Sequence, residues 1–269
     1  MRAKPNSILQ ATFNGTDYTI DLSRMTQVNK RTGFTRAIRR HPIKSMLDDF
    51  AGGVDAYPAY WPKVAEQKSS FATVQLDANS LVYKEVEQMV GLPSGSQRKI
   101  VDITLVINIY EWKMYHMLIR HRSGEDITGE LTAAAAQRVV KKQRYLFHGT
   151  DKMNVKPICQ NGFLRDHSKI AMFGYGTYFA KGAGYSLQPA YAKVSPEGEQ
   201  FLLLSRVFVG DYCQGNSTMQ MPPPKTATKA GEAPVLYDSM VNSPTDPTIF
   251  VLSTGSDHQA YPEFIIRLK

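Results

Sequence analysis

The sequence is poor in cysteine and has no long apolar run. Its 269 residues include two cysteines, Cys159 and Cys213, with no CxxC pair or cysteine–histidine cluster. We therefore expect neither a disulfide framework nor a zinc site. No apolar stretch approaches the roughly 18 to 20 residues that span a bilayer, and the opening MRAKPNSILQ has no signal-peptide core. We expect an intracellular, metal-free protein of the nucleus, the cytoplasm or both, with no membrane partner.

The chain is basic but otherwise ordinary in composition. Its formal net charge is +8, and 42% of its residues are hydrophobic. That share is enough for a sizeable core, in one large domain with or without a small appendage. The positive charge favours a polyanionic partner, such as nucleic acid or a phosphate-bearing ligand. A solvated basic face explains the charge equally well.

Two segments have helical periodicity. The first repeats apolar residues at Val82, Val86 and Val90, with Ser80 as a suitable N-cap and Gly91 beyond the end. The second follows Asn108, which forms a capping-box-like pair with Glu111. Its aromatic and aliphatic stripe is typical of a core-facing helix rather than a ligand site; it consists of Ile109, Trp112, Tyr115 and Ile119.

After Arg144 the apolar segments predict short strands. They are RYLFHG, GTYFA, EQFLLLSRVFVG, TIFVLST and EFIIRL. Few helical segments lie between them, and there is no regular strand–helix alternation. The sequence therefore favours an α+β fold with antiparallel sheets over a doubly wound fold.

Three segments carry residue types suited to chemistry. In YLFHGT, His148 lies at a strand end before Gly149, although a lone histidine there is more often structural. In FGYGTYFAKGAGYSLQPAY, glycines alternate with tyrosines. This pattern suits a flat aromatic ligand, and a cationic ring would gain about 0.5 to 2 kcal/mol from an aromatic face. The third segment is TIFVLSTGSDHQAYPEF.

These segments occur in an order that resembles a known family. LFHGT, GYGTYFA, the YS pair, PPPK, LYDS and QAYPEF resemble the poly-ADP-ribose-polymerase-like catalytic domain, and especially its mono-ADP-ribosyltransferase members. That resemblance implies a diphtheria-toxin-like fold with split antiparallel sheets and flanking helices. The N-terminal YTIDLSRMTQVNKRTGFTRAIRR resembles the second half of a WWE domain. We expect a partial WWE-like segment at residues 1–45, a linker at 46–68 and the catalytic domain at 69–269.

The resemblance implies that NAD is the substrate and that no metal is needed. His148 would bond a ribose hydroxyl, and Tyr178 would be the second residue of the catalytic triad. The Gly149 backbone and the Ser186 hydroxyl would hold the nicotinamide carboxamide. The other positions implied to contact NAD are Thr150, Arg165 on the adenosine or phosphate side, Tyr191 stacked on the nicotinamide ring, and Tyr185 as a second stacking candidate.

Pro189 is a departure from the family pattern. Family members run into a helix after the position of Ser186. Proline is tolerated in the first turn of a helix but not deeper. We therefore expect the helix here to begin late.

The third triad position separates polymer formation from single transfer. Polymer-forming members have a glutamate there, and Glu263 in PEF is a tempting match. In the family that residue opens a strand before an Asp-x-Gln turn, and the final strand follows. TIFVLST then supplies the third residue, Ile249, and Glu263 is a residue of the last strand. Its carboxylate would then be a strand group rather than the catalytic group, facing water in the simplest case.

An isoleucine at the third position predicts transfer of one ADP-ribose unit to an acceptor, most simply a protein side chain. The alternatives are a catalytically weak or inactive member that binds NAD or ADP-ribose, a NAD hydrolase, and an enzyme that modifies RNA ends. The WWE-like segment either binds an ADP-ribose-type ligand or is a structural remnant, which we favour.

Overall fold

The computed structural model describes the chain in ten stretches separated by gaps: residues 8–13, 16–21, 24, 26–37, 57–62, 70–122, 138–163, 172–225, 234–253 and 258–269. The chain divides into two compact units, Met1–Lys44 and Ser45–Lys269. Within these described stretches, no helix is both long and apolar enough to cross a bilayer.

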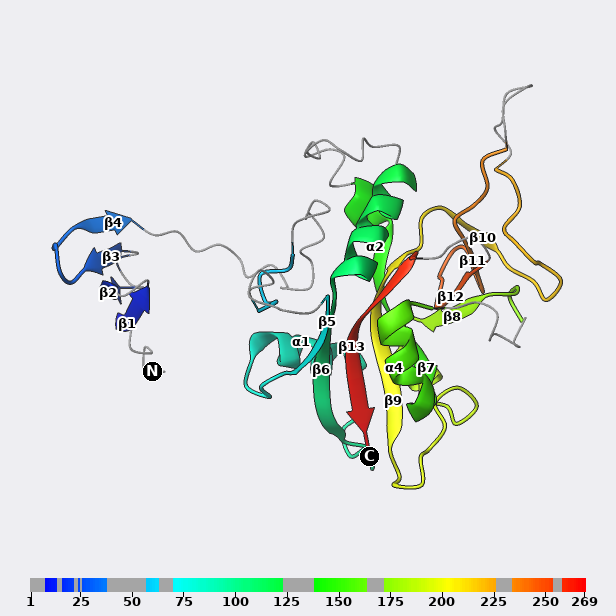
Figure 1. Cartoon of the computed structure of the whole chain (residues 1–269), viewed down its shortest axis with the longest axis horizontal. Helices are drawn as coiled ribbons and strands as arrows, with labels where there is room; N and C mark the ends of the chain where they lie inside the picture. Colours follow the sequence, from blue (N-terminus) through cyan, green and yellow to red (C-terminus); the bar gives the residue numbers. More distant parts are fainter. Residues whose placement is uncertain are drawn as a thin grey trace. The chain divides into compact units, whose positions relative to one another are not determined.

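The smaller unit contains a four-stranded antiparallel sheet, drawn in blue in Figure 1. Its strands follow one another in space as in sequence: β1 (Ile8–Phe13), β2 (Thr16–Asp21), β3 (Thr26–Asn29) and β4 (Thr35–Ala37). A turn at Thr32-Gly33 joins β3 to β4, and the Asn29 side chain accepts the backbone amides of Arg31 and Thr32.

The larger unit is built on a nine-stranded sheet with the order β10-β11-β12-β8-β7-β9-β13-β6-β5 (Figure 1). Only β10 and β11 pair in parallel; the other neighbours are antiparallel. The α+β prediction is confirmed. The strands are β5 (Phe71–Gln75), β6 (Ile100–Asn108), β7 (Gln143–Thr150), β8 (Thr177–Ala180), β9 (Gln200–Phe208), β10 (Tyr212–Gln214), β11 (Ser239–Val241), β12 (Ile249–Leu252) and β13 (Ala260–Leu268).

The sheet is split between β7 and β8. These two strands pair at a single position, Phe147 with Ala180. In contrast, β7 pairs with β9 along its whole length, from Gln143 to Thr150. The two parts of the sheet therefore diverge directly after Phe147, where His148 follows, and this is the split geometry expected from the family resemblance.

Helix α1 (Leu81–Val90) has the ends that the sequence predicts. The Ser80 side chain accepts the Tyr83 amide, and Gly91 ends the helix in the left-handed conformation, with φ 57°. Val82 and Val86 are buried, as their spacing requires.

Helix α2 (Ile109–Arg122) begins with half of the expected capping box. Asn108 Oδ1 accepts the Glu111 amide at 3.1 Å. The second bond of a capping box, from the Asn108 backbone amide to the Glu111 carboxylate, is absent between these two described residues. The Asn108 backbone amide donates to the Tyr261 hydroxyl instead, and the Glu111 carboxylate contacts His258 Nδ1 at 2.7 Å. The stripe on this helix does face the core, since Trp112, Tyr115 and Ile119 are buried.

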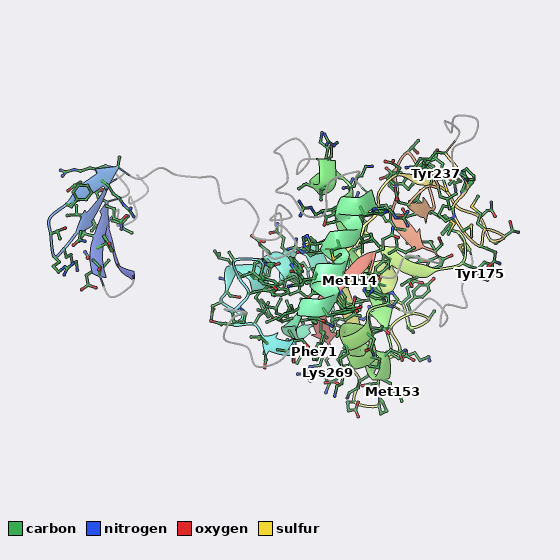
Figure 2. All side chains as sticks on the ribbon, turned by 45° about the horizontal axis from the view of Figure 1, so that its top comes forward. Phe71, Met114, Met153, Tyr175, Tyr237 and Lys269 are labelled. Atoms are coloured by element: carbon green, nitrogen blue, oxygen red, sulfur yellow. The ribbon has the colours of Figure 1, made fainter. Side chains whose placement is uncertain are left out.

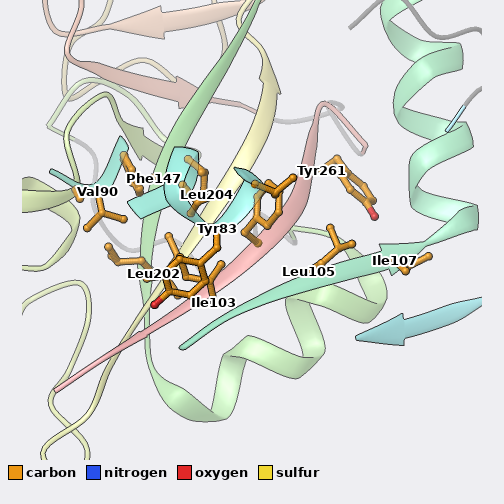
Figure 3. Packing of buried hydrophobic residues seen from close by; sticks show 14 of the residues in the cluster. Tyr83, Val90, Ile103, Leu105, Ile107, Phe147, Leu202, Leu204 and Tyr261 are labelled. Atoms are coloured by element: carbon orange, nitrogen blue, oxygen red, sulfur yellow. The ribbon is translucent and has the colours of Figure 1, made fainter. Parts of the chain in front are cut away.

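Both faces of the sheet are covered. Figure 3 shows the larger core, where residues such as Tyr83, Leu105, Phe147 and Leu204 pack together. On the other face, α4 (Lys152–Asn161) packs Val155 and Cys159 against Leu203 of β9. Every residue of β9 is buried, because this strand lies mid-sheet between β7 and β13. Met153 of α4 points away from the sheet and is 87% exposed (Figure 2).

Part of the expected linker packs into the larger unit. Trp61 is 6% exposed, and its ring lies 4.9 Å from that of Trp112 and 5.5 Å from that of Tyr57. Tyr60 bonds Glu263 in β13. The segment 57–62 therefore contributes to this core, while the boundaries expected at 45/46 and 68/69 stay predictions.

Candidate active site

A cavity of about 660 Å³ opens where β7 and β8 diverge. Its walls come from the end of β7, from α4, from β8, and from α5 (Ala183–Ser186) with the segment that follows it. Seven of the expected site residues line it: His148, Gly149, Thr150, Tyr178, Tyr185, Ser186 and Tyr191. Ile249 is not among the lining residues, and Arg165 lies outside the described residues.

His148 presents one ring nitrogen as a hydrogen-bond acceptor. Its Nδ1 lies 2.8 Å from the Tyr178 carbonyl oxygen, which only accepts, so Nδ1 carries the proton. Desolvation lowers the pKa of His148, and the bond to the Tyr178 carbonyl opposes that effect. The ring is therefore neutral near pH 7, and its Nε2 can accept a hydrogen bond from a ligand hydroxyl. The rings of Phe163 and Phe179 lie 5.1 and 5.6 Å from it.

The Tyr178 hydroxyl is anchored to the main chain. It donates to the Gly174 carbonyl at 2.7 Å and accepts the Phe173 amide at 2.9 Å. Burial raises its pKa, so the hydroxyl stays protonated. Tyr178 therefore offers the cavity a neutral ring in a fixed position.

Gly149 lies against the backbone of Ser186. A Cβ atom at Gly149 would fall 2.0 Å from the Ser186 carbonyl oxygen, so no larger residue fits. The resemblance implies that the Gly149 backbone holds a ligand carboxamide, and the contact with Ser186 between two walls of the cavity is a second reason for glycine here. The Ser186 hydroxyl donates to the Phe147 carbonyl at 3.1 Å, which leaves its oxygen free to accept an amide N–H.

Tyr185 and Tyr191 stack on each other. Their ring centroids are 5.0 Å apart at an interplanar angle of 23°, and their hydroxyls lie 2.8 Å apart. Burial, followed by the bond to Tyr191, raises the pKa of Tyr185. A flat ligand does not fit between rings this close and would stack on an outer face of the pair.

The expected late helix start at Pro189 is wrong. The short α5 ends at Ser186, before Pro189, and the chain continues in turns in which the Tyr191 amide donates to the Gln188 carbonyl. Proline therefore follows a helix end instead of opening a new helix. Tyr191 reaches the cavity from a turn.

Ile249 and Glu263 occupy different environments. Ile249 opens β12, is 4% exposed and pairs with Ala180, a residue that lines the cavity. Glu263 lies in β13, as expected, but it does not face water. It is 0% exposed, and its Oε2 lies 2.6 Å from Nε of Arg206. Burial with a cationic partner explains this carboxylate without catalysis.

Sequence reasoning missed several lining residues, including Asp151, Phe163 and Lys193. Asp151 directly follows the expected site residue Thr150, and Lys193 lies two positions beyond Tyr191, so proximity in sequence was the available signal. Within the described ranges, no group of three or more histidine, cysteine or acidic side chains is placed to hold a metal ion.

Comparisons with known proteins find two domain families in this chain. The poly(ADP-ribose) polymerase catalytic domain matches residues 80–267, and the WWE domain matches residues 1–40. Protein mono-ADP-ribosyltransferase PARP12 of Homo sapiens is 30% identical over 264 residues, which cover 93% of this chain and 34% of that protein. PARP11 of Homo sapiens, with the same activity in its name, is 28% identical over 98% of this chain and 79% of its own length.

The chain thus spans about a third of the length of its PARP12 relatives, in Homo sapiens and Mus musculus alike. The catalytic-domain match covers the strands and helices that form the cavity, and the WWE match covers the four-stranded sheet of the smaller unit. The chain belongs to the poly(ADP-ribose) polymerase catalytic-domain family, with a WWE domain at its N-terminal end.

Proposed function

We propose that this chain transfers a single ADP-ribose unit from NAD to an acceptor and releases nicotinamide. The observation that carries the proposal is Ile249, an apolar residue that opens the strand next to β8 and has no carboxylate to offer an acceptor. Relatives named as mono-ADP-ribosyltransferases support the same activity.

The cavity fits NAD as a substrate. Its volume of about 660 Å³ falls in the range of small-molecule sites, roughly 300 to 1,000 Å³. His148 Nε2 is an acceptor for a ribose hydroxyl. The Ser186 oxygen is an acceptor for the carboxamide N–H, and the Tyr185–Tyr191 pair provides an aromatic face for the nicotinamide ring.

These residues act by positioning. When the bond between C1′ and the nicotinamide nitrogen breaks, its electron pair neutralises the pyridinium, and positive charge develops on the ribose. An acceptor oxygen then attacks C1′. Neutral His148 and Tyr178 hold the ribose and the nicotinamide ring without adding charge. Their main contribution to the rate is therefore the orientation of the reacting groups.

Elongation of an ADP-ribose chain needs a general base in addition to these positioning residues. A ribose hydroxyl is a weak nucleophile and requires a base, whereas a protein carboxylate attacks without one. Ile249 supplies no base. Among the described lining residues the one carboxylate is Asp151, and it pairs with Lys193 at 2.8 Å. We therefore propose that acceptors bring their own nucleophile.

Two other activities remain as competing proposals. Water as the acceptor would make the chain a NAD hydrolase, and RNA ends would suit the net charge of +8. A catalytically weak or inactive member that binds NAD or ADP-ribose is a third candidate, and the presence of His148 at the first triad position argues against it. We also propose an intracellular location, on composition alone. For the WWE match at residues 1–40 both readings stay open: a site for an ADP-ribose-type ligand, or a structural remnant, which we favour.

Incubation with labelled NAD and a candidate acceptor protein tests the proposal. Wild type should release nicotinamide and label the acceptor, and His148→Ala should lose at least about tenfold in rate, as expected for a positioning contact. Nicotinamide release without labelled acceptor indicates hydrolysis, labelled RNA indicates RNA-end transfer, and no nicotinamide release by wild type contradicts an active enzyme.

A further inference from the structure

An ion pair joins two walls of the cavity. Lys193 Nζ lies 2.8 Å from Asp151 Oδ2, and both residues line the cavity. Asp151 follows β7 and precedes α4, whereas Lys193 lies two residues beyond Tyr191. The pair therefore connects the wall that carries His148 to the wall that carries the stacked tyrosines.

These two residues are the charged groups of the cavity. Among its described lining residues, Lys193 is the one permanent cation and Asp151 the one carboxylate. Asp151 stands at the N-cap position of α4, where a carboxylate usually accepts a helix amide, but it makes no side-chain cap bond. Its carboxylate instead bonds Lys193.

The ion pair between Lys193 and Asp151 is exposed to solvent, so breaking it costs little folding free energy. The Lys193 side chain is 72% exposed and that of Asp151 is 33% exposed. Ion pairs of this kind contribute little to folding, because water solvates both partners well and salt screens them. The structure therefore does not need this pair, and Lys193 can leave Asp151 when a better anion arrives.

We propose that Lys193 binds the diphosphate of the dinucleotide. In the absence of ligand its ammonium group is paired with Asp151, and this ion pair breaks when the diphosphate binds. This inference rests on the proposed function, since it takes NAD as the ligand. The nicotinamide and its ribose are assigned to Ser186, Tyr191 and His148, and the diphosphate is the next group along the molecule. A diphosphate carries more negative charge than one carboxylate, so it competes for the ammonium group.

The two members of the pair have opposite effects on affinity. Lys193 attracts the diphosphate. Asp151 weakens binding, because it competes for the lysine and repels the ligand at short range. The pair thereby selects ligands with a diphosphate over uncharged fragments, and it makes binding sensitive to ionic strength.

Titration calorimetry on the full chain tests this, with ADP and nicotinamide as probes. Lys193→Gln should weaken ADP binding by about fivefold or more at low salt and leave nicotinamide binding within about twofold. Lys193→Arg should retain ADP binding within about threefold. Asp151→Asn should strengthen ADP binding or leave it unchanged.

Lys152 provides a matched control. It neighbours Asp151 in sequence, but its ammonium group pairs with Glu197 and Glu199, and it does not line the cavity. Lys152→Gln removes the same charge from the same surface, so an equal loss of ADP affinity in this variant would reduce the effect to bulk electrostatics and overturn the proposal.

Two further results would overturn it. One is unchanged ADP affinity in Lys193→Gln, and the other is a loss in Asp151→Asn as large as in Lys193→Gln. The proposed transfer reaction fails separately: a wild type that binds ADP through Lys193 but releases no nicotinamide from NAD contradicts the reaction and leaves the diphosphate contact standing.

Discussion

Arg206 and Glu263 form an ion pair in the interior of the sheet. Nε of Arg206 lies 2.6 Å from Oε2 of Glu263, and both side chains are 0% exposed. The Tyr145 and Tyr60 hydroxyls donate to the same carboxylate, and the Arg206 guanidinium also lies 5.3 Å from the centre of the Trp112 ring. The carboxylate that looked catalytic in the sequence belongs to this network.

Glu263→Gln should therefore destabilise the fold and spare the chemistry. Removing one charge leaves Arg206 buried without its counterion, which costs about 3 to 5 kcal/mol in comparable pairs. Denaturant unfolding measures the loss. The rate of nicotinamide release per folded molecule should stay near that of wild type, since Glu263 does not line the cavity. A more than tenfold loss in fully folded protein would reassign Glu263 to catalysis.

Tyr60→Phe tests whether the segment 57–62 is part of the catalytic fold. The Tyr60 hydroxyl donates to Glu263 and accepts Arg206 Nη2 at 2.8 Å, so its removal should cost about 1 to 3 kcal/mol of unfolding free energy. Tyr57→Phe is the control, because Tyr57 stacks on Trp61 by its ring. Equal stability of the two variants would mean that the hydroxyl network contributes nothing.

His116 makes stability depend on pH. Burial, and then the charges of Arg206 and Arg120, lowers its pKa to about 3 from an ordinary 6.5. Between these values the unfolded chain binds a proton that the folded chain does not, so stability falls as pH drops below about 6.5. The loss from this residue should reach about 2 to 3 kcal/mol near pH 4.5.

His116→Phe should reduce this acid sensitivity, because the ring is kept and the titrating group is removed. Urea unfolding of both proteins at pH 7 and pH 4.5 measures it. If the two proteins lose the same free energy over that range, the acid sensitivity comes from groups other than His116.

Gly149→Ala should damage the cavity. The new methyl group would fall 2.0 Å from the Ser186 carbonyl oxygen, so the two walls must separate, at a cost of about 1 to 3 kcal/mol or more. We expect weaker binding of nicotinamide together with the stability loss. Gly184→Ala in α5 is the control, since nothing lies within 4 Å of a Cβ there. A Gly149→Ala protein that binds nicotinamide normally would contradict the close contact.

The sequence predicted the features that depend on neighbouring residues. Helix α1 follows from Ser80, Gly91 and the spacing between them, and all of these lie within a few turns. Seven of the expected site residues line one cavity, and Ile249 lies beside it in β12.

Features that depend on distant contacts were not predictable in the same way. The partners of Glu263 lie 57 and 203 positions away in the sequence, at Arg206 and Tyr60, so its burial was not visible from the strand pattern. Pro189 was read correctly as incompatible with a helix interior, but the pattern did not distinguish a late start from an early end. Arg165 lies outside the described residues, and its contact with NAD stays a prediction.

The most direct test of single-unit transfer is mass spectrometry of the modified peptides of an acceptor protein after incubation with NAD and the wild-type chain. We predict a mass addition of one ADP-ribose at each modified site, with at least about tenfold less modified peptide in the His148→Ala reaction. Chains of ADP-ribose on a single site would contradict it, because Ile249 offers no base to activate the next ribose hydroxyl.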